Sequence, residues 1–176
     1  MPLLDRPALL DRLAGIGLLS LDVDGVQTDG GLYYAEDGSE LRRFHVHDGQ
    51  GIKQVMAAGV AVAFVTASTT PAIGHRAARL GVAHAFLGVP DKEAALAGLC
   101  QTLGLGLDRV AHVGDDVNDL GLLRLVGCPL TVANARPEVR DACLYVTTTP
   151  GGAGAVREIC DLILNARTET TRRDVR

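Results

Sequence analysis

The sequence predicts an α/β fold with a doubly wound parallel sheet and a β-hairpin extension. Short runs rich in β-branched residues alternate with longer segments of helical periodicity. Each strand-like run is nearly continuous in apolar residues, which is typical of central strands covered by helices on both faces. Because strands that alternate with helices form right-handed βαβ units, the runs are expected to join one parallel sheet.

The elements follow in order along the chain. The first strand is predicted at 18–23 and ends at an Asp-Gly turn. The other predicted strands are 60–65, 110–113 and 130–132. Helices are predicted at 51–58, 71–80, 92–103, 118–126 and 155–166. Pro71 and Pro137 fit the first position of a helix, and Gly59, Gly81 and Gly104 stand where helices should end.

One segment interrupts the alternation. Residues 30–46 are expected to form a β-hairpin, because two strand-like stretches flank a turn that contains Gly38. Leu32, Tyr33, Tyr34 and Phe44 would make an exposed hairpin prone to aggregation unless another surface covers it.

Composition places the chain among globular proteins of one domain. It has 176 residues, of which 47% are hydrophobic and 22% are charged. The domain is expected over residues 1–166, followed by a polar, aperiodic and disordered tail at 167–176. No apolar run approaches the roughly 20 residues of a membrane span, and the charged N-terminus does not fit a signal peptide. We therefore expect a cytoplasmic protein with no membrane partner.

Charge and aromatic content argue against a nucleic-acid partner. The net charge is −4, and the chain has three Tyr, three Phe and no Trp. The four cysteines form no CxxC pair and are expected to be buried free thiols.

The residues that could carry chemistry follow the strands, where parallel sheets place their ligand sites. Carboxylates, a hydroxyl group and a lysine are expected to converge on one edge of the sheet. The set is Asp22, Asp24, Thr66, Lys92, Asp115, Asp116 and Asp119. Asp116 and Asp119 could equally complement a helix N-terminus.

These residue types suit metal-assisted phosphoryl transfer. Crowded carboxylates are costly unless a cation lies among them, and oxygen ligands favour Mg²⁺. Lys92 and the Thr66 hydroxyl can hold phosphoryl oxygens. A carboxylate can attack phosphorus, and a second carboxylate two residues later can protonate the leaving oxygen and then activate water.

Four segments in order resemble the motifs of haloacid-dehalogenase-type phosphatases. They are DVDGVQT at 22–28, Thr66, Lys92 and GDDVND at 114–119. The resemblance implies a Rossmann-like fold in which Asp22 is the nucleophile and Asp24 is the general acid and base. It implies that Thr66 and Lys92 hold the phosphoryl group. Asp22, the Asp24 carbonyl and Asp115 would bind Mg²⁺, with Asp116 and Asp119 in supporting roles.

The spacing of these motifs leaves no room for a cap domain. About 40 residues separate Asp24 from Thr66 and about 25 separate Thr66 from Lys92, whereas a cap needs about 50 or more. TDGG at 28–31, FHVHDGQGI at 44–52 and PGGAGAVREICD at 150–161 resemble the capless tetrameric branch. That branch includes phosphatases of 3-deoxy-D-manno-octulosonate 8-phosphate and of ketodeoxynonulosonate 9-phosphate.

Membership of that branch implies a homotetramer in which a neighbouring subunit covers the site. The matching positions for substrate contact are His45, His47, Asp48, Gly49, Lys53 and Arg76. His45 and His47 alternate as on a strand and could also suggest a metal pair, but no third ligand is evident. His75, His84 and His112 are expected to be structural.

The second motif departs from the branch. It reads Thr66-Ala67-Ser68, where octulosonate phosphatases usually have Thr-Gly-Arg and nonulosonate phosphatases often Thr-Gly-Glu. We therefore expect hydrolysis of a phosphorylated 3-deoxy-2-ketoaldonic acid of the octulosonate 8-phosphate type. The alternatives are a nonulosonate 9-phosphate, a broader range of sugar phosphates, or a non-catalytic accessory domain of a sugar-acid activating pathway.

Overall fold

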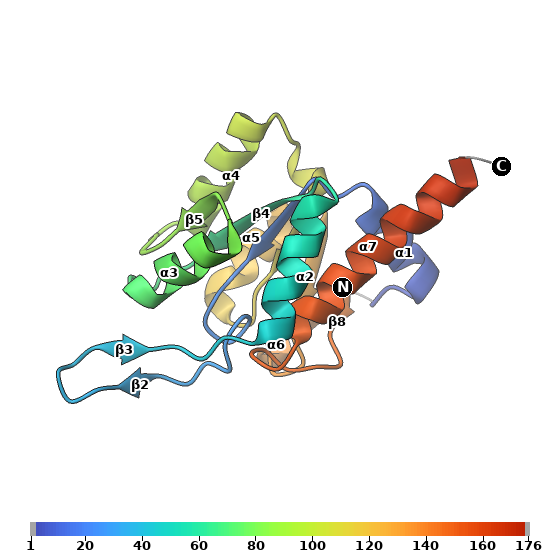
Figure 1. The fold of residues 1–176 in the computed structure, drawn as a ribbon. Helices are drawn as coiled ribbons and strands as arrows, with labels where there is room; N and C mark the ends of the chain where they lie inside the picture. The colour runs from blue at the N-terminus through green and yellow to red at the C-terminus, as the bar shows by residue number, and fades with distance from the viewer. Residues whose placement is uncertain (1–2, 175–176) are drawn as a thin grey trace.

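The computed structural model describes residues 3–174 and confirms the predicted parallel sheet (Figure 1). Six strands pair in the order β5-β4-β1-β6-β7-β8, and every pair is parallel. The strands are β1 (Leu18–Leu21), β4 (Ala61–Val65), β5 (His84–Phe86), β6 (Val110–Val113), β7 (Cys128–Thr131) and β8 (Tyr145–Val146). The pairing places β1 at the centre, between β4 and β6.

The register of these three strands aligns their carboxyl ends. Leu21 pairs with Phe64 of β4 and with Val113 of β6. The chain therefore leaves all three strands at nearly the same level, and the residues that follow start side by side. This alignment brings together motifs that are far apart in the sequence.

Alternating side chains of the central strands fill a core on each face of the sheet. Leu19 and Leu21 join one apolar cluster, whereas Leu18 joins the other. The larger cluster receives side chains from α1 (Arg6–Ala14), α2 (Val46–Ala57), α3 (Pro71–Leu80) and α7 (Ala155–Asp174). The smaller cluster packs beneath α4 (Lys92–Leu103). Both faces are covered, which explains the continuous apolar runs of the strands.

Two helices differ from the predicted elements at the N-terminal side. Helix α1 has no counterpart among the predicted elements, and the Asp5 side chain caps it by accepting a hydrogen bond from the Ala8 N–H at 2.9 Å. Helix α2 begins at Val46 instead of residue 51. A Cβ at Gly51 would lie 3.0 Å from Arg157 and Cys160 of α7. Gly51 therefore permits close packing of α2 on α7.

The remaining helices are short. They are η1 (Leu107–Arg109), η2 (Val117–Asp119), α5 (Leu120–Leu125) and α6 (Pro137–Asp141). The predicted helix at 118–126 is thus a turn of 3₁₀ helix followed by a short α-helix. Pro137 occupies the first turn of α6, as predicted.

The hairpin is present and projects away from the sheet (Figure 1). Its strands, β2 (Tyr33–Tyr34) and β3 (Glu40–Leu41), are antiparallel and much shorter than the predicted stretches. Leu32, Tyr34 and Leu41 are 52%, 63% and 58% exposed. Apolar side chains on this hairpin are therefore uncovered in the single chain.

The C-terminal helix is longer than the predicted helix at 155–166. Helix α7 continues through residues 167–174, while residues 175–176 lie outside the described part. Ala166 is buried, Arg167 Nη1 donates to the Ile16 carbonyl at 3.4 Å, and Thr168 Oγ1 donates to the Leu164 carbonyl. Packing near residue 166 thus supports the helix beyond the end of its apolar pattern. In the described range, no helix is long and apolar enough to cross a membrane.

Candidate active site

A cavity of about 290 Å³ opens at the carboxyl ends of β1, β4 and β6. Asp22 and Asp24 line it after β1, Thr66 after β4 and Asp115 after β6, while Lys92 enters from α4. The expected convergence of these side chains is therefore present in the structure. Ala67, Ser68, Asp116 and Asn118 complete much of the wall.

Asp22 is fixed by its position immediately after β1. Its N–H donates to the Val113 carbonyl at 2.9 Å, and its own carbonyl accepts a hydrogen bond from Gln27 Nε2 at 3.2 Å. The residue is 6% exposed. Burial, assisted by the negative charge of Asp119, outweighs Lys92 and raises the pKa of Asp22 to about 7.

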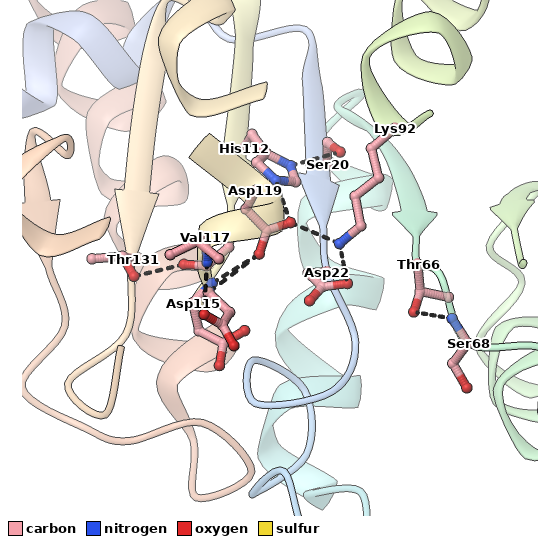
Figure 2. A network of polar contacts seen from close by, with 12 residues as sticks. Ser20, Asp22, Thr66, Ser68, Lys92, His112, Asp115, Val117, Asp119 and Thr131 are labelled. Atoms are coloured by element: carbon pink, nitrogen blue, oxygen red, sulfur yellow. Dashed lines mark hydrogen bonds and ion pairs between the residues drawn. The ribbon is translucent and has the colours of Figure 1, made fainter. Parts of the chain in front are cut away.

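Lys92 is buried at the first position of α4 and bridges two carboxylates (Figure 2). Its Nζ donates to Asp22 Oδ1 at 2.9 Å and to Asp119 Oδ1 at 2.7 Å. Burial alone would lower the pKa of Lys92, but the two carboxylates outweigh burial and raise it above the ordinary value. Lys92 is thus a fixed positive charge beside Asp22.

Asp119 is a fully buried support for this arrangement. Its Oδ2 accepts hydrogen bonds from the N–H groups of Asp115 and Asp116, at 3.1 and 3.4 Å. Burial raises the pKa of Asp119, but nearby His112 and Lys92 outweigh it and lower the pKa to about 2. The ionised carboxylate therefore orients both Lys92 and the loop that carries Asp115.

His112 lies behind Asp119, and its ring contacts were not anticipated. The residue is fully buried, with Nδ1 3.0 Å from Ser20 Oγ and Nε2 3.6 Å from Asp119 Oδ1. The second distance is longer than a hydrogen bond. His112 therefore lies buried between Ser20 and Asp119, in keeping with the expected structural role (Figure 2).

Asp115 faces Asp22 across the cavity. Burial, followed by the charges of Asp119 and Asp116, raises the pKa of Asp115 to about 7. A Cβ on Gly25, whose φ is +82°, would lie only 2.0 Å from Asp115 Oδ2. Glycine is therefore required at position 25 both for the left-handed backbone and for the approach of this carboxylate.

The carboxylates fit a divalent cation. Asp22, Asp115 and Asp119 each offer an oxygen within 4.8 Å of the others. Lys92 is shared between Asp22 and Asp119, and Asp115 makes no ion pair among the described residues, so the charges of Asp22 and Asp115 are not fully compensated. Their raised pKa values reflect this incomplete charge compensation, which a hard cation with oxygen ligands would complete.

Thr66 begins the turn after β4. It is 2% exposed, and its Oγ1 accepts a hydrogen bond from the Ser68 N–H at 3.1 Å (Figure 2). The Thr66 hydroxyl hydrogen remains available as a donor toward the cavity, because a hydroxyl group can accept and donate at once. This geometry suits contact with a phosphoryl oxygen.

Asp24 stands at the mouth of the cavity and has a partner that the sequence reading missed. Its Oδ1 accepts a hydrogen bond from Arg42 Nε at 2.7 Å. Arg42 follows β3 on the hairpin, 18 residues away along the chain. Local sequence gives no signal for this pair, because the return arm of a hairpin can meet the sheet in many ways.

The residues expected to contact substrate lie apart from this cavity in the single chain. The set is His45, His47, Asp48, Gly49, Lys53 and Arg76, and none of them is among the described residues that line it. His45 occupies the N-cap position of α2 and His47 lies in the first turn, so the expected strand-like alternation is wrong. The two rings meet edge-on, with centroids 4.9 Å apart.

Asp48 and Arg76 have structural partners. Asp48 is buried and its Oδ1 accepts a hydrogen bond from the Arg157 N–H at 2.8 Å, near the start of α7. Arg76 Nη2 donates to the His45 carbonyl at 2.9 Å, and its guanidinium carbon lies 5.1 Å from the centre of the Phe44 ring. A Cβ on Gly49 would meet Arg76 at 2.7 Å, and Lys53 is exposed.

Comparison with known proteins identifies the relatives of this chain. The profile of haloacid dehalogenase-like hydrolases matches residues 88–159. The 3-deoxy-D-manno-octulosonate 8-phosphate phosphatase of Salmonella typhimurium is 39% identical over 92% of this chain and 86% of its own length. The Yersinia pestis phosphatase of the same name is 41% identical over 90% of this chain and 85% of its own.

Solved structures show the same likeness. A crystal structure of the Yersinia pestis phosphatase superposes with a TM-score of 0.89 at 41% identity, covering 91% of this chain and 86% of that one. The structure of the Moraxella catarrhalis enzyme, in complex with magnesium, phosphate and KDO, has a TM-score of 0.89 at 36% identity and covers 96% of this chain and 97% of that one. The structure of the cobalt-bound Haemophilus influenzae enzyme has a TM-score of 0.86 at 39% identity and covers 89% of this chain and 92% of that one.

Proposed function

The chain belongs to the haloacid dehalogenase-like phosphatases, in the group of the 3-deoxy-D-manno-octulosonate 8-phosphate phosphatases, and on that premise we propose its substrate and mechanism. We propose that it hydrolyses a phosphorylated 3-deoxy-2-ketoaldonic acid, of the octulosonate 8-phosphate type, with Mg²⁺ as cofactor. The observation that carries the proposal is Lys92 bridging Asp22 and Asp119 beside Asp115 in one cavity.

Mg²⁺ would be held by Asp22, Asp115 and the Asp24 carbonyl. The carboxylates of Asp22 and Asp115 fit it, since Lys92 offsets the charge of Asp22 only in part and Asp115 makes no ion pair among the described residues. When bound, the cation supplies positive charge that reduces repulsion between these carboxylates and the anionic phosphoryl group.

In the first step, a carboxylate oxygen of Asp22 attacks phosphorus. A bond forms between Asp22 and the phosphoryl group as the bond from phosphorus to the sugar oxygen breaks. Lys92 Nζ and the Thr66 hydroxyl donate to the phosphoryl oxygens, which gather negative charge. Asp24, two residues after the nucleophile, gives a proton to the departing sugar oxygen.

In the second step, water attacks the phosphorus of the aspartyl-phosphate. Asp24, now a carboxylate, accepts the proton from the water, and the bond from phosphorus to Asp22 breaks. Inorganic phosphate and free Asp22 result, so the enzyme returns to its starting state.

Asp116 has a supporting role beside the site. Its Oδ1 accepts a hydrogen bond from the Val117 N–H and thereby caps η2, which ends at Asp119.

The sugar-acid substrate is supported by the relatives, whose names specify 3-deoxy-D-manno-octulosonate 8-phosphate. Ser68 and Ala67 line both the catalytic cavity and a larger one beside the hairpin. In place of the branch's long charged side chain, Ser68 offers a small hydroxyl group there. A nonulosonate 9-phosphate or another sugar phosphate is therefore the second candidate.

We also propose a homotetramer in which a second copy covers the hairpin. Support comes from the exposed apolar side chains of Leu32, Tyr34 and Leu41. In such an assembly, the surface of α2 and α3 that carries His45, His47, Asp48, Gly49, Lys53 and Arg76 could serve a neighbouring cavity. The cytoplasmic location expected from the sequence stays a prediction.

The test is phosphate release with Mg²⁺ from a panel of sugar phosphates. The panel contains both ketodeoxy sugar-acid esters and common hexose phosphates. Preference for the octulosonate ester supports the proposal, and preference for the nonulosonate ester selects the second candidate. Turnover of every ester at similar rates discards the sugar-acid substrate. Absence of turnover by folded, metal-loaded protein favours the accessory-domain alternative.

A further inference from the structure

The guanidinium group of Arg42 is shielded although it belongs to a projecting hairpin. Its side chain is 3% exposed, whereas that of the next residue, Arg43, is 59% exposed. A guanidinium group that leaves water needs fixed partners to replace its hydration. Arg42 is therefore held in a specific place, unlike its neighbour.

Each nitrogen of this guanidinium group has a partner. Nη2 lies 3.0 Å from Glu40 Oε2, and Nη1 donates to the Leu41 carbonyl at 3.4 Å. Both partners belong to the same arm of the hairpin, so they orient the group relative to that arm. The third nitrogen, Nε, donates to Asp24 Oδ1 at 2.7 Å. That charge-assisted bond crosses from the hairpin to the loop after β1.

Asp24 lies where two cavities meet. It lines the cavity of about 290 Å³ that holds Asp22 and Lys92, and also a cavity of about 1060 Å³ between the hairpin and α3. A phosphate ester whose phosphoryl group lies beside Lys92 and whose alcohol part fills the larger cavity has its ester oxygen at this junction. The orientation of the Asp24 carboxylate therefore decides whether it reaches that oxygen.

We propose that Arg42 is a positioning residue that fixes the Asp24 carboxylate for catalysis, an inference that rests on the proposed function. By engaging Oδ1, Arg42 leaves Oδ2 to face the ester oxygen and, later, the attacking water. The hairpin thereby contributes to the reaction of its own chain. A carboxylate displaced by about 1 Å can lose about 100-fold in rate, so removal of Arg42 should be visible in kinetics.

The experiment compares Arg42→Gln and Arg42→Lys with wild type, using Arg43→Gln as a matched control on the same arm. The value of kcat/KM, which reports on the steps through formation of the aspartyl-phosphate, is measured with two substrates. One is the best alkyl phosphate of the panel, and the other is p-nitrophenyl phosphate. The alkyl ester needs a proton on its leaving oxygen, whereas p-nitrophenolate leaves with little help.

Arg42→Gln should lower kcat/KM for the alkyl ester by about 10- to 100-fold and for p-nitrophenyl phosphate by less than about threefold. Arg42→Lys should recover part of the alkyl activity, because an ammonium group can still pair with Asp24. Inhibition by inorganic phosphate should stay within about twofold of wild type, because phosphate is held by other residues. Equal losses for both esters would overturn the proposal, since they indicate general distortion.

A double-mutant cycle separates this inference from the proposed function. If Arg42 acts through Asp24, then Arg42→Gln should cause no further loss in an Asp24→Asn background. A further loss in that background would contradict the positioning of Asp24 by Arg42. Wild-type kinetics for Arg42→Gln would contradict it too, even if Asp24→Asn is impaired. An Asp24→Asn variant as active as wild type instead contradicts the role of Asp24 in the proposed function. Thermal unfolding verifies that each variant folds. If Arg42→Gln does not fold, the comparison of Arg42→Lys with wild type provides the test.

Discussion

The ammonium group of Lys92 lies 2.9 Å from Asp22 Oδ1, and both side chains are less than a tenth exposed. The same ammonium group donates to Asp119 Oδ1 at 2.7 Å, so one lysine from α4 is shared by a carboxylate after β1 and a carboxylate of η2. This bridge joins three motifs that are distant in the sequence. It also places a positive charge beside the residue proposed to attack phosphorus.

Replacement of Lys92 by methionine should damage both stability and activity. Two buried carboxylates would lose their partner, so the free energy of unfolding should fall by about 3 kcal/mol. Loss of a donor to the phosphoryl oxygens should lower kcat by about 100-fold or more. Denaturant titration and phosphate release measure the two effects. The control is Arg124→Met on the exposed side of α5, which should change neither.

Metal-free protein should lose stability as pH rises. Asp22 and Asp115 have pKa values raised from 3.8 to about 7, so between these values the folded protein binds more protons than the unfolded chain. The free energy of unfolding therefore falls as pH increases through that window, because ionisation places uncompensated charge in the cavity. Saturating Mg²⁺ should remove the fall, because the bound cation compensates both carboxylates.

Thermal unfolding between pH 4 and pH 8, with EDTA or with Mg²⁺, measures this dependence. Asp115→Asn should flatten the curve of the metal-free protein, since the substituted amide does not ionise. It should also weaken stabilisation by Mg²⁺. A metal-free protein whose stability is constant or increases from pH 4 to pH 7 would show that ionisation of these two carboxylates does not destabilise the fold.

The hairpin should hold an oligomer together. Leu41→Glu places a charge among exposed apolar side chains, so light scattering should show a species smaller than the tetramer proposed for wild type. Leu125→Glu is the matched control, because Leu125 is also exposed but lies on α5, away from the hairpin. A monomeric wild-type protein at micromolar concentration, or a tetramer that survives Leu41→Glu, rejects the hairpin as the interface.

The residues at the centre of the site could be predicted from the sequence because most of them directly follow strands. Asp22, Thr66 and Asp115 each follow a buried apolar run, and parallel pairing places such residues at one edge of the sheet. Lys92 was predicted through its place in the ordered set of four motifs, because a lysine at a helix start would by itself be expected to face solvent. The strand ends need only the periodicity of the sequence and the parallel topology that it implies.

Residues whose roles depend on distant packing were not predictable in this way. Arg42 meets Asp24 only because the return arm of the hairpin brings it to the loop after β1. The start of α2 at Val46 was not predicted, because residues up to 46 were assigned to the hairpin and the helical pattern was recognised only from Gly51. The extension of α7 depends on contacts near residue 166 that a polar, aperiodic sequence does not reveal.

The most direct measurement is phosphate release from 3-deoxy-D-manno-octulosonate 8-phosphate by wild type and by Asp22→Asn, with Mg²⁺ present. The asparagine variant is nearly the same size, so it should fold and bind inorganic phosphate. It cannot attack phosphorus, so its kcat should be lower by at least about 1,000-fold. A clean Asp22→Asn preparation that keeps a tenth or more of wild-type turnover would contradict Asp22 as the nucleophile.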